Sequence, residues 1–364
     1  MTADPLTPAQ TAALAYVRSV ALTERPTALA AIARELADAD VDDRPEHLLA
    51  GVVASGRLTV NFHPDRPSVD GRTVADALAA DGVYRSQFVT GISNGGLTAY
   101  PGGDRDRWER LLFDGAYQRA GVLPADRPTY GGLNLLDHPD GACPRFGSCH
   151  LRLRPAVLAR ATFCHGDSHL GPRANGTADA FEPVLAALMT STVDTGECLG
   201  RAGMDVGTVA RTLCAPVAPA TPPAMGRALD DYVEAQIHGT LDLARDVEAL
   251  VVDPSFDGTP VGATLELIAR RHGFPLERHP GFVLPVERVD PVFRGPAIPV
   301  LAARLHREFS RPGAPVDAAL IGRAAASVVT EPARWADRGP ITDTLQHLKQ
   351  LWHVLVRYGV PRVP

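Results

Sequence analysis

The chain has 364 residues with 36 basic and 42 acidic side chains, which gives a net charge of −6 at neutral pH. That balance does not favour nucleic-acid binding through a broad basic surface. No apolar run of about 18 residues predicts a membrane span, and the N-terminus lacks the pattern of a signal peptide. Five cysteines without a CxxC pair indicate a reduced, cytoplasmic protein.

The first 55 residues are predicted to be helical. Thr7 and Gln10 have the spacing of a capping box, and Pro8 occupies the first helical position. A second helix, rich in Ala and Leu, is expected around residues 27–38. Residues 1–55 are therefore assigned to an N-terminal helical segment.

From residue 57 the pattern changes to strands separated by Gly/Pro loops. Leu58, Val60 and Phe62 alternate with polar residues, which is typical of a strand with one buried face. The further strands are predicted at residues 87–92, 132–136, 146–153, 159–164, 232–238 and 250–253, with one helix over 104–119. We expect these pieces to form a sheet-based core over residues 56–260.

After residue 260 the pattern is helical again. Helices are predicted at residues 263–272, 297–309, 317–329 and 342–358. Residues 261–364 are therefore assigned to a C-terminal helical region, and the whole chain to the α+β class.

One predicted strand carries an unusual set of polar side chains. Alternation puts Glu234, Gln236 and His238 on one face, together with Tyr232. Burying such a face is costly unless its groups are paired, so we expect it to line water or a cleft. The plainer explanation is the solvated face of an edge strand.

Residues 86–96 (SQFVTGISNGG) combine short hydroxyls with glycines around Thr90, Gly91, Ser93 and Asn94. Such a segment lets the backbone approach a ligand closely, although Asn-Gly is also the strongest short signal for a turn. His63 ends the first strand on its polar side. A single histidine is usually structural, so His63 gains interest only if it lies near these residues.

The order of these pieces resembles the ADP-ribosyltransferase superfamily. In that superfamily a strand ending in His or Arg is followed by a hydroxyl-rich strand and then by a strand bearing a glutamate. The corresponding pieces here are His63, Thr90-Gly-Ile-Ser93 and Glu234. The stretches RPTYGGLNL, PRFGSCHLRL and RATFCHGDS also resemble a bacterial family of uncharacterised proteins, over roughly residues 57–300.

The resemblance to the transferases implies a split mixed sheet around a cleft for NAD, which is a substrate in this chemistry. Glu234 would hydrogen-bond the 2′-hydroxyl of the nicotinamide ribose and stabilise the cationic sugar as nicotinamide leaves. His63 would hold a ribose hydroxyl. Thr90 and Ser93 would orient Glu234.

The remaining candidates for cofactor binding follow from the same resemblance. Tyr130 would stack on nicotinamide, with Tyr100 as the alternative. Arg66 would contact the pyrophosphate or is simply a surface charge. The other members of the set are Gly91, Asn94 and Gln236.

The resemblance leaves the acceptor open between protein, nucleic acid and small molecule. Many relatives carry Glu or Gln two positions before the catalytic glutamate, where this chain has Tyr232. Modification of arginine is therefore not expected. Cleavage of NAD to free ADP-ribose, the glycohydrolase reaction, is the other form of the same chemistry.

Two other interpretations compete with the transferase. A metal-dependent hydrolase is one, because the sequence offers short-spaced ligands at His63 and Asp65 and at His165, Asp167 and His169, with His238 available as well. The transferase interpretation involves no metal. The second alternative is a catalytically inactive binding module of the same fold.

Overall fold

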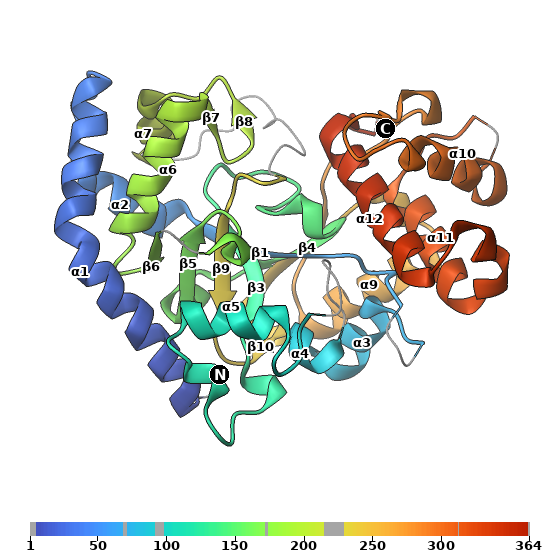
Figure 1. The fold of residues 1–364 in the computed structure, drawn as a ribbon, viewed down its shortest axis with the longest axis horizontal. Coiled ribbons are helices and arrows are strands. Elements are labelled where there is room, and N and C mark those ends of the chain that lie inside the picture. Colours follow the sequence, from blue (N-terminus) through green and yellow to red (C-terminus); the bar gives the residue numbers. More distant parts are fainter. Residues whose placement is uncertain are drawn as a thin grey trace.

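The computed structural model describes residues 5–67, 71–91, 98–171, 174–214, 229–311 and 313–362. A mixed sheet of eight strands lies at its centre, with helices on both sides and at both ends (Figure 1). In sheet order the strands are β12 (Leu276–Arg278), β11 (Val247–Val252), β4 (Cys149–Leu153), β1 (Arg57–Phe62), β3 (Thr129–Asn134), β9 (Val233–Ile237), β5 (Ala161–His165) and β6 (Asn175–Thr177). Only the β11–β12 pair is parallel among these neighbours. The α+β class predicted from the sequence is confirmed.

Two small sheets and the helices complete the described fold. The remaining strands form two small sheets, β2 (Val83–Tyr84) with β10 (Leu241–Asp242) and β7 (Glu197–Cys198) with β8 (Arg201–Ala202). The helices are α1 (Pro8–Asp38), α2 (Pro45–Ser55), α3 (Val74–Asp81), α4 (Gln87–Thr90), α5 (Asp104–Leu112), α6 (Glu182–Thr195), α7 (Val206–Cys214), α8 (Leu243–Asp246), α9 (Pro260–His272), α10 (Ala297–Phe309), α11 (Ala318–Thr330) and α12 (Ile341–Tyr358). None of the described helices is both long and apolar enough to cross a bilayer.

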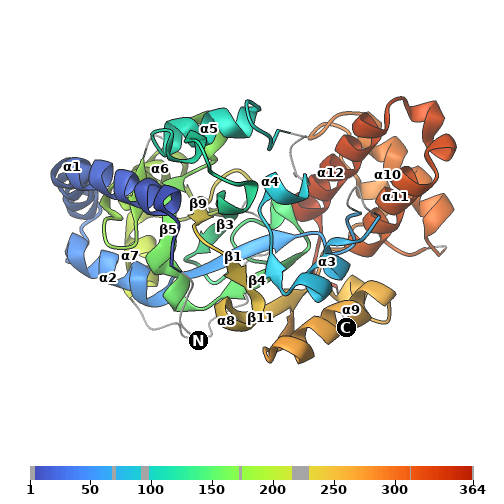
Figure 2. The same cartoon turned by 90° about the horizontal axis from the view of Figure 1, so that it is seen from below.

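Residues 8–38 form one continuous helix, α1, where the sequence predicted two, and α2 follows within the N-terminal segment. The capping box is present, since Thr7 Oγ1 accepts from the Gln10 backbone and Gln10 Oε1 accepts from the Thr7 backbone at 2.9 Å. Pro26 lies inside the helix and removes one backbone donor. The helix continues past it because α1 packs along α6, as both views show (Figures 1 and 2).

The junction between β1 and β3 is short, and the sheet opens beside it. Their paired register runs only from Arg57↔Asn134 to Thr59↔Gly132. Beyond Thr59, β1 pairs with β4 alone, and before Gly132, β3 pairs with β9 alone. The sheet thus consists of two halves of four strands joined at this junction, rather than two separate sheets.

A glycine permits the close approach of the two halves. A Cβ built on Gly131 would lie 2.5 Å from the carbonyl oxygen of Thr59, a backbone atom that cannot move aside. The diverging ends, Asn61–Phe62 on β1 and Thr129–Tyr130 on β3, do not pair with each other. They line a cavity instead.

Two predicted elements differ from the structure in the region that matters for the site. Residues 87–90 form the single helical turn α4, ending at Gly91 with φ of 63°, so the strand predicted over 87–92 is wrong. The helix predicted over 104–119 ends at Leu112, and a separate 3-10 turn, η1 (Ala116–Gln118), follows it. Asp114 and Gly115 adopt positive φ between them, which breaks the helix.

The C-terminal helices α10, α11 and α12 pack together at the end of the molecule opposite α1 (Figures 1 and 2). Trp352 connects this group to the sheet. Its indole Nε1 donates to the carbonyl of Pro144 at 2.8 Å, and its ring lies 5.1 Å from that of His63 at the end of β1. The sheet also extends past the predicted core boundary at residue 260, because β12 joins it.

Candidate functional site

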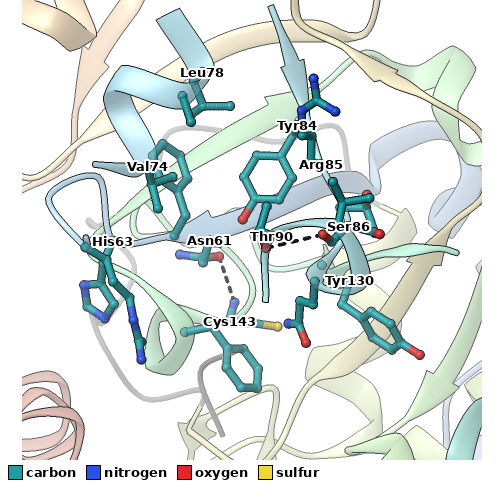
Figure 3. A pocket seen from close by; sticks show the side chains of 18 of the residues that line it. Asn61, His63, Val74, Leu78, Tyr84, Arg85, Ser86, Thr90, Tyr130 and Cys143 are labelled. Atoms are coloured by element: carbon teal, nitrogen blue, oxygen red, sulfur yellow. Dashed lines mark hydrogen bonds between the residues drawn. The ribbon is translucent and has the colours of Figure 1, made fainter. Parts of the chain in front are cut away.

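A cavity of about 570 Å³ lies where β1 and β3 diverge. Its walls come from the ends of these strands, the segment from α3 to α4, helix α5, the 3-10 turn η3 (Pro144–Phe146) and helix α12. Figure 3 shows Asn61 and Cys143 at its floor, with the backbone N–H of Cys143 donating to Asn61 Oδ1 at 3.3 Å. The volume is within the range of about 300–1,000 Å³ that is typical of small-molecule sites.

The structure brings several of the predicted residues together in this cavity. The predicted residues that line it are His63, Arg66, Thr90, Tyr130 and Glu234. Gly91 and Gln236 do not line it. Ser93 and Asn94 lie outside the described residues, so their predicted roles are not addressed by the structure.

Glu234 presents its carboxylate from β9, with 5% of the residue exposed. Gln236 Nε2 donates to its Oε1 at 2.8 Å, and the backbone N–H of Ser168 donates to its Oε2 at 3.4 Å. Burial raises the pKa of Glu234 and the nearby Asp167 raises it further, while Ser168 and Arg105 oppose that shift. The carboxylate is therefore oriented, but it is harder to ionise than an exposed one.

A chain of hydrogen bonds extends behind Glu234 on the same strand face. Thr162 Oγ1 donates to Gln236 Oε1 at 2.8 Å and contacts His238 Nε2 at 3.1 Å, while the hydroxyl of Tyr117 lies 2.5 Å from His238 Nδ1. Burial lowers the pKa of His238 to about 3, so its ring is neutral. When the neutral ring carries its proton on Nε2, every hydrogen bond in the chain has one donor and one acceptor. His238 then donates to Thr162, which donates to Gln236, which donates to Glu234.

Glu234 lines the cavity, but the prediction that the whole face lines water or a cleft is wrong for Gln236 and His238. Gln236 and His238 are both 0% exposed. Phe113 and Tyr117, from the segment after α5, pack edge-on and stacked against the His238 ring and close that part of the face. The polar groups are buried because they are paired with one another.

Thr90 lines the cavity from α4 rather than from a strand. Its hydroxyl donates to the carbonyl of Ser86 at 3.3 Å within the helical turn (Figure 3). Glu234 accepts hydrogen bonds from Gln236 and the backbone of Ser168, and the role of Thr90 in orienting it stays a prediction.

Tyr130 stands between a carboxylate and a guanidinium. Its hydroxyl donates to Glu109 Oε1 at 3.0 Å, and Arg105 lies over its ring at 4.3 Å from the centroid. One face of the ring is therefore occupied. The alternative aromatic, Tyr100, is 56% exposed and does not line the cavity.

His63 occupies the end of β1 beside Trp352. Burial, together with the charge of Arg66, lowers the pKa of His63 to about 3. The ring is neutral at physiological pH, so it can donate or accept a single hydrogen bond without carrying charge.

The sequence analysis missed several residues that line the cavity. They are Tyr84, Arg105, Trp108, Arg145 and Lys349. Arg105 and Trp108 are three residues apart on α5. This spacing shows that they share one side of the helix, but it does not show that this side lines a cavity. Lys349 is remote in sequence and reaches the site only because Trp352 docks α12 onto β1.

The metal ligands proposed for a hydrolase do not converge in the described part of the chain. Asp65 lies against α11, where a Cβ on Gly322 would overlap its carboxylate. Asp167 pairs with His169 at 2.8 Å, whereas His238 belongs to the buried chain behind Glu234. Within the described residues, the group with metal-ligand spacing is Asp43, His47 and Cys214, which lie just before α2, on α2 and on α7, away from the cavity.

No curated protein matches the chain significantly. A family model does match, over residues 57–358, which run from the first residue of β1 to the last residue of α12. The match extends beyond the part of the chain in which the sequence motifs were recognised, and it includes the helix that carries Lys349. The chain therefore belongs to the family described as protein of unknown function DUF3626.

Proposed function

We propose that the protein cleaves NAD at the bond between nicotinamide and ribose, as an ADP-ribosyltransferase or an NAD glycohydrolase. The observation that carries the proposal is Glu234, a buried carboxylate that lines a cavity of about 570 Å³ and is held by donors on its protein side. A carboxylate in that position is suited to stabilise positive charge on a ligand.

The chemistry requires little else from the protein. As the bond from C1′ to the nicotinamide nitrogen breaks, the leaving nicotinamide takes the electron pair and positive charge develops on the ribose. Ionised Glu234 would accept from the ribose 2′-hydroxyl and offset that charge. A water or an acceptor nucleophile then forms the new bond at C1′ and gives its proton to solvent.

The neighbouring residues are suited to hold the ribose and the base. Neutral His63 would hydrogen-bond a ribose hydroxyl from the β1 side. Tyr130 would offer to nicotinamide the ring face that Arg105 leaves open, and Trp108 and Tyr84 supply further aromatic surface in the same cavity.

The opening between β1 and β3 also supports the transferase interpretation. A sheet of two halves with a ligand cleft at their junction is what the superfamily resemblance implies. Two features differ from that pattern, since the halves stay hydrogen-bonded at the junction and Thr90 is on a helix. The proposal therefore depends on Glu234 and the cavity rather than on the three-strand motif.

The test is the Glu234→Gln variant, with nicotinamide release from NAD as the measurement. We expect a loss of about 100-fold or more, because the amide keeps the shape but cannot supply the negative charge. Glu266→Gln, a change at a half-exposed position on α9, is the matched control and should leave the rate unchanged. Circular dichroism and thermal melting establish that both variants fold.

The acceptor is sought separately, by mass spectrometry of a cell lysate incubated with labelled NAD. Release of nicotinamide without a labelled product favours the glycohydrolase. If folded wild type neither releases nicotinamide nor labels any component, the enzymatic proposal fails and the binding-module alternative takes its place.

A further inference from the structure

The end of the cavity nearest α12 is strongly basic. Six of the residues that line the cavity are Arg or Lys and three are acidic, in a chain whose net charge is −6. Three of the cations come from separate parts of the chain, Arg66 after β1, Arg145 on η3 and Lys349 on α12. The fold thus gathers positive charge where β1, η3 and α12 meet.

Lys349 is the most informative member of the group, because it is the only lysine in the sequence. Its ammonium is half-buried and, among the residues that the structure describes, has no hydrogen bond or ion pair. Desolvation and the charges of Arg145, Arg66 and Arg294 lower the pKa of Lys349 to about 8, while the charge of Asp167 acts in the other direction. Holding an ammonium there is unfavourable unless an anion joins it.

Arg145 is directed toward the same place by contacts on its far side. Its Nη1 donates to the carbonyl of Leu229 at 2.9 Å and pairs with exposed Asp230, while its buried Nε has no partner within the described residues. These contacts fix the guanidinium in position at the cavity wall.

Among the described residues around this end, negative charge comes from exposed Asp230, which pairs with Arg145, and from Asp167. His353, one turn after Lys349, is buried, and the surrounding cations together with desolvation hold its pKa far below the usual range. His63 is neutral for the same kind of reason. Asp167 is engaged with His169.

We propose that Lys349, Arg145 and Arg66 form a binding subsite for a phosphate group at the α12 end of the cavity. Phosphate fits because its oxygens accept charge-assisted bonds from both an ammonium and a guanidinium, and because two or more cations match its charge. The identity of the phosphate as the pyrophosphate of NAD rests on the proposed function. The subsite itself does not.

The experiment is calorimetric titration of inorganic pyrophosphate, and separately of ADP-ribose, into wild type and Lys349→Gln. Wild type should bind pyrophosphate, and Lys349→Gln should bind it about 10- to 100-fold more weakly, as expected for loss of a charged hydrogen bond. Lys349→Arg should keep most of the affinity. Arg270→Gln, at an exposed position on α9, should bind like wild type.

Further arms separate this proposal from the proposed function. Glu234→Gln should bind pyrophosphate as wild type does, even though it no longer cleaves NAD. Weaker binding of both pyrophosphate and ADP-ribose to Lys349→Gln assigns the subsite to the dinucleotide, whereas an effect on pyrophosphate alone assigns it to a phosphorylated second substrate. Absence of pyrophosphate binding to wild type, or equal binding to Lys349→Gln, overturns the subsite.

Discussion

The carboxylate of Glu234 receives its orienting hydrogen bonds from behind the cavity wall. Gln236 and the backbone of Ser168 both donate to it, and both favour its ionised form. Burial and Asp167 act against ionisation and win, since the pKa of Glu234 is raised above the ordinary 4.5. Under the proposed function only the ionised form is active, so activity is present above this raised pKa and is lost as the pH falls through it.

Gln236→Leu should shift this loss of activity, the acidic limb of the pH profile, to higher pH by about one unit, because the substitution removes a hydrogen-bond donor to the carboxylate. The measurement is the pH dependence of kcat/KM for nicotinamide release. At high pH, where Glu234 is ionised in both proteins, the rates should approach each other. A uniformly lower rate with an unmoved limb would mean that Gln236 acts only through the fold.

At the level of single residues, the sequence predicted which side chains share a strand face better than it predicted what covers that face. Strict alternation correctly placed Glu234, Gln236 and His238 on one face of a strand. Alternation cannot reveal what covers a face, and here the covering groups, Phe113 and Tyr117, come from a turn more than 100 residues earlier in the chain. The partners that make burial of these groups tolerable were therefore not predictable from the strand itself.

At the level of elements the misassigned helix α4 has a clear cause. A single turn such as Gln87–Thr90 is too short to show helical periodicity, and its apolar β-branched content favours a strand assignment. The turn ends at Gly91 in the left-handed region, and at its start the Ser86 hydroxyl donates to the carbonyl of Pro124, which is distant in sequence and which periodicity cannot show. By contrast, α9, α10, α11 and α12 each span several turns and lie within a few residues of their predicted bounds.

The hydrogen-bonded chain that connects β5 and β9 should contribute measurably to stability. Thr162→Val keeps the shape of the side chain but leaves Gln236 Oε1 and His238 Nε2 without their partner in a fully buried place. We expect a loss of about 1–3 kcal/mol in the free energy of unfolding, measured by urea denaturation.

Thr192→Val is the matched control for this prediction. Thr192 is nearly as buried as Thr162, but its hydroxyl donates to the carbonyl of Leu188 within helix α6 and otherwise contacts the thiol of Cys198, which is only a weak hydrogen-bonding partner. Its loss should therefore be smaller. Equal effects of the two substitutions would contradict a special role for the buried chain.

At the level of the whole molecule the sequence predicted the parts but not their arrangement. Periodicity predicts the helical ends and the sheet-based core, and the order of motifs selects His63 and Glu234, which line the same cavity. Strand order is set by long-range pairing that leaves no local signal, so the opening between β1 and β3 was not predictable from spacing. The docking of α12 was equally hidden, which is why Lys349 was missed.

The contact between the sheet and the C-terminal helices should make stability depend on pH. Asp65 follows β1 and lies against Gly322 of α11. Burial raises its pKa to about 7, and the charge of Asp253 adds to this, while Arg323 and Arg66 oppose it. In the unfolded chain this carboxyl ionises near the ordinary aspartate pKa of 3.8, whereas the folded chain keeps it protonated up to a pH of about 7. Between these values the folded state binds more protons, so stability falls as the pH rises.

Asp65→Asn should remove this dependence, because the amide resembles the protonated acid at every pH. The variant should be close to wild type at pH about 4 and more stable than wild type at pH about 8, by an amount on the order of 2–4 kcal/mol. Urea unfolding across this pH range measures it, with Asp194→Asn at an exposed position of α6 as the control. Parallel pH profiles for Asp65→Asn and wild type would show that Asp65 is ionised in the folded protein. In that case the contact between β1 and α11 would be stabilised by charge pairing with Arg323 and Arg66 instead of by a protonated acid.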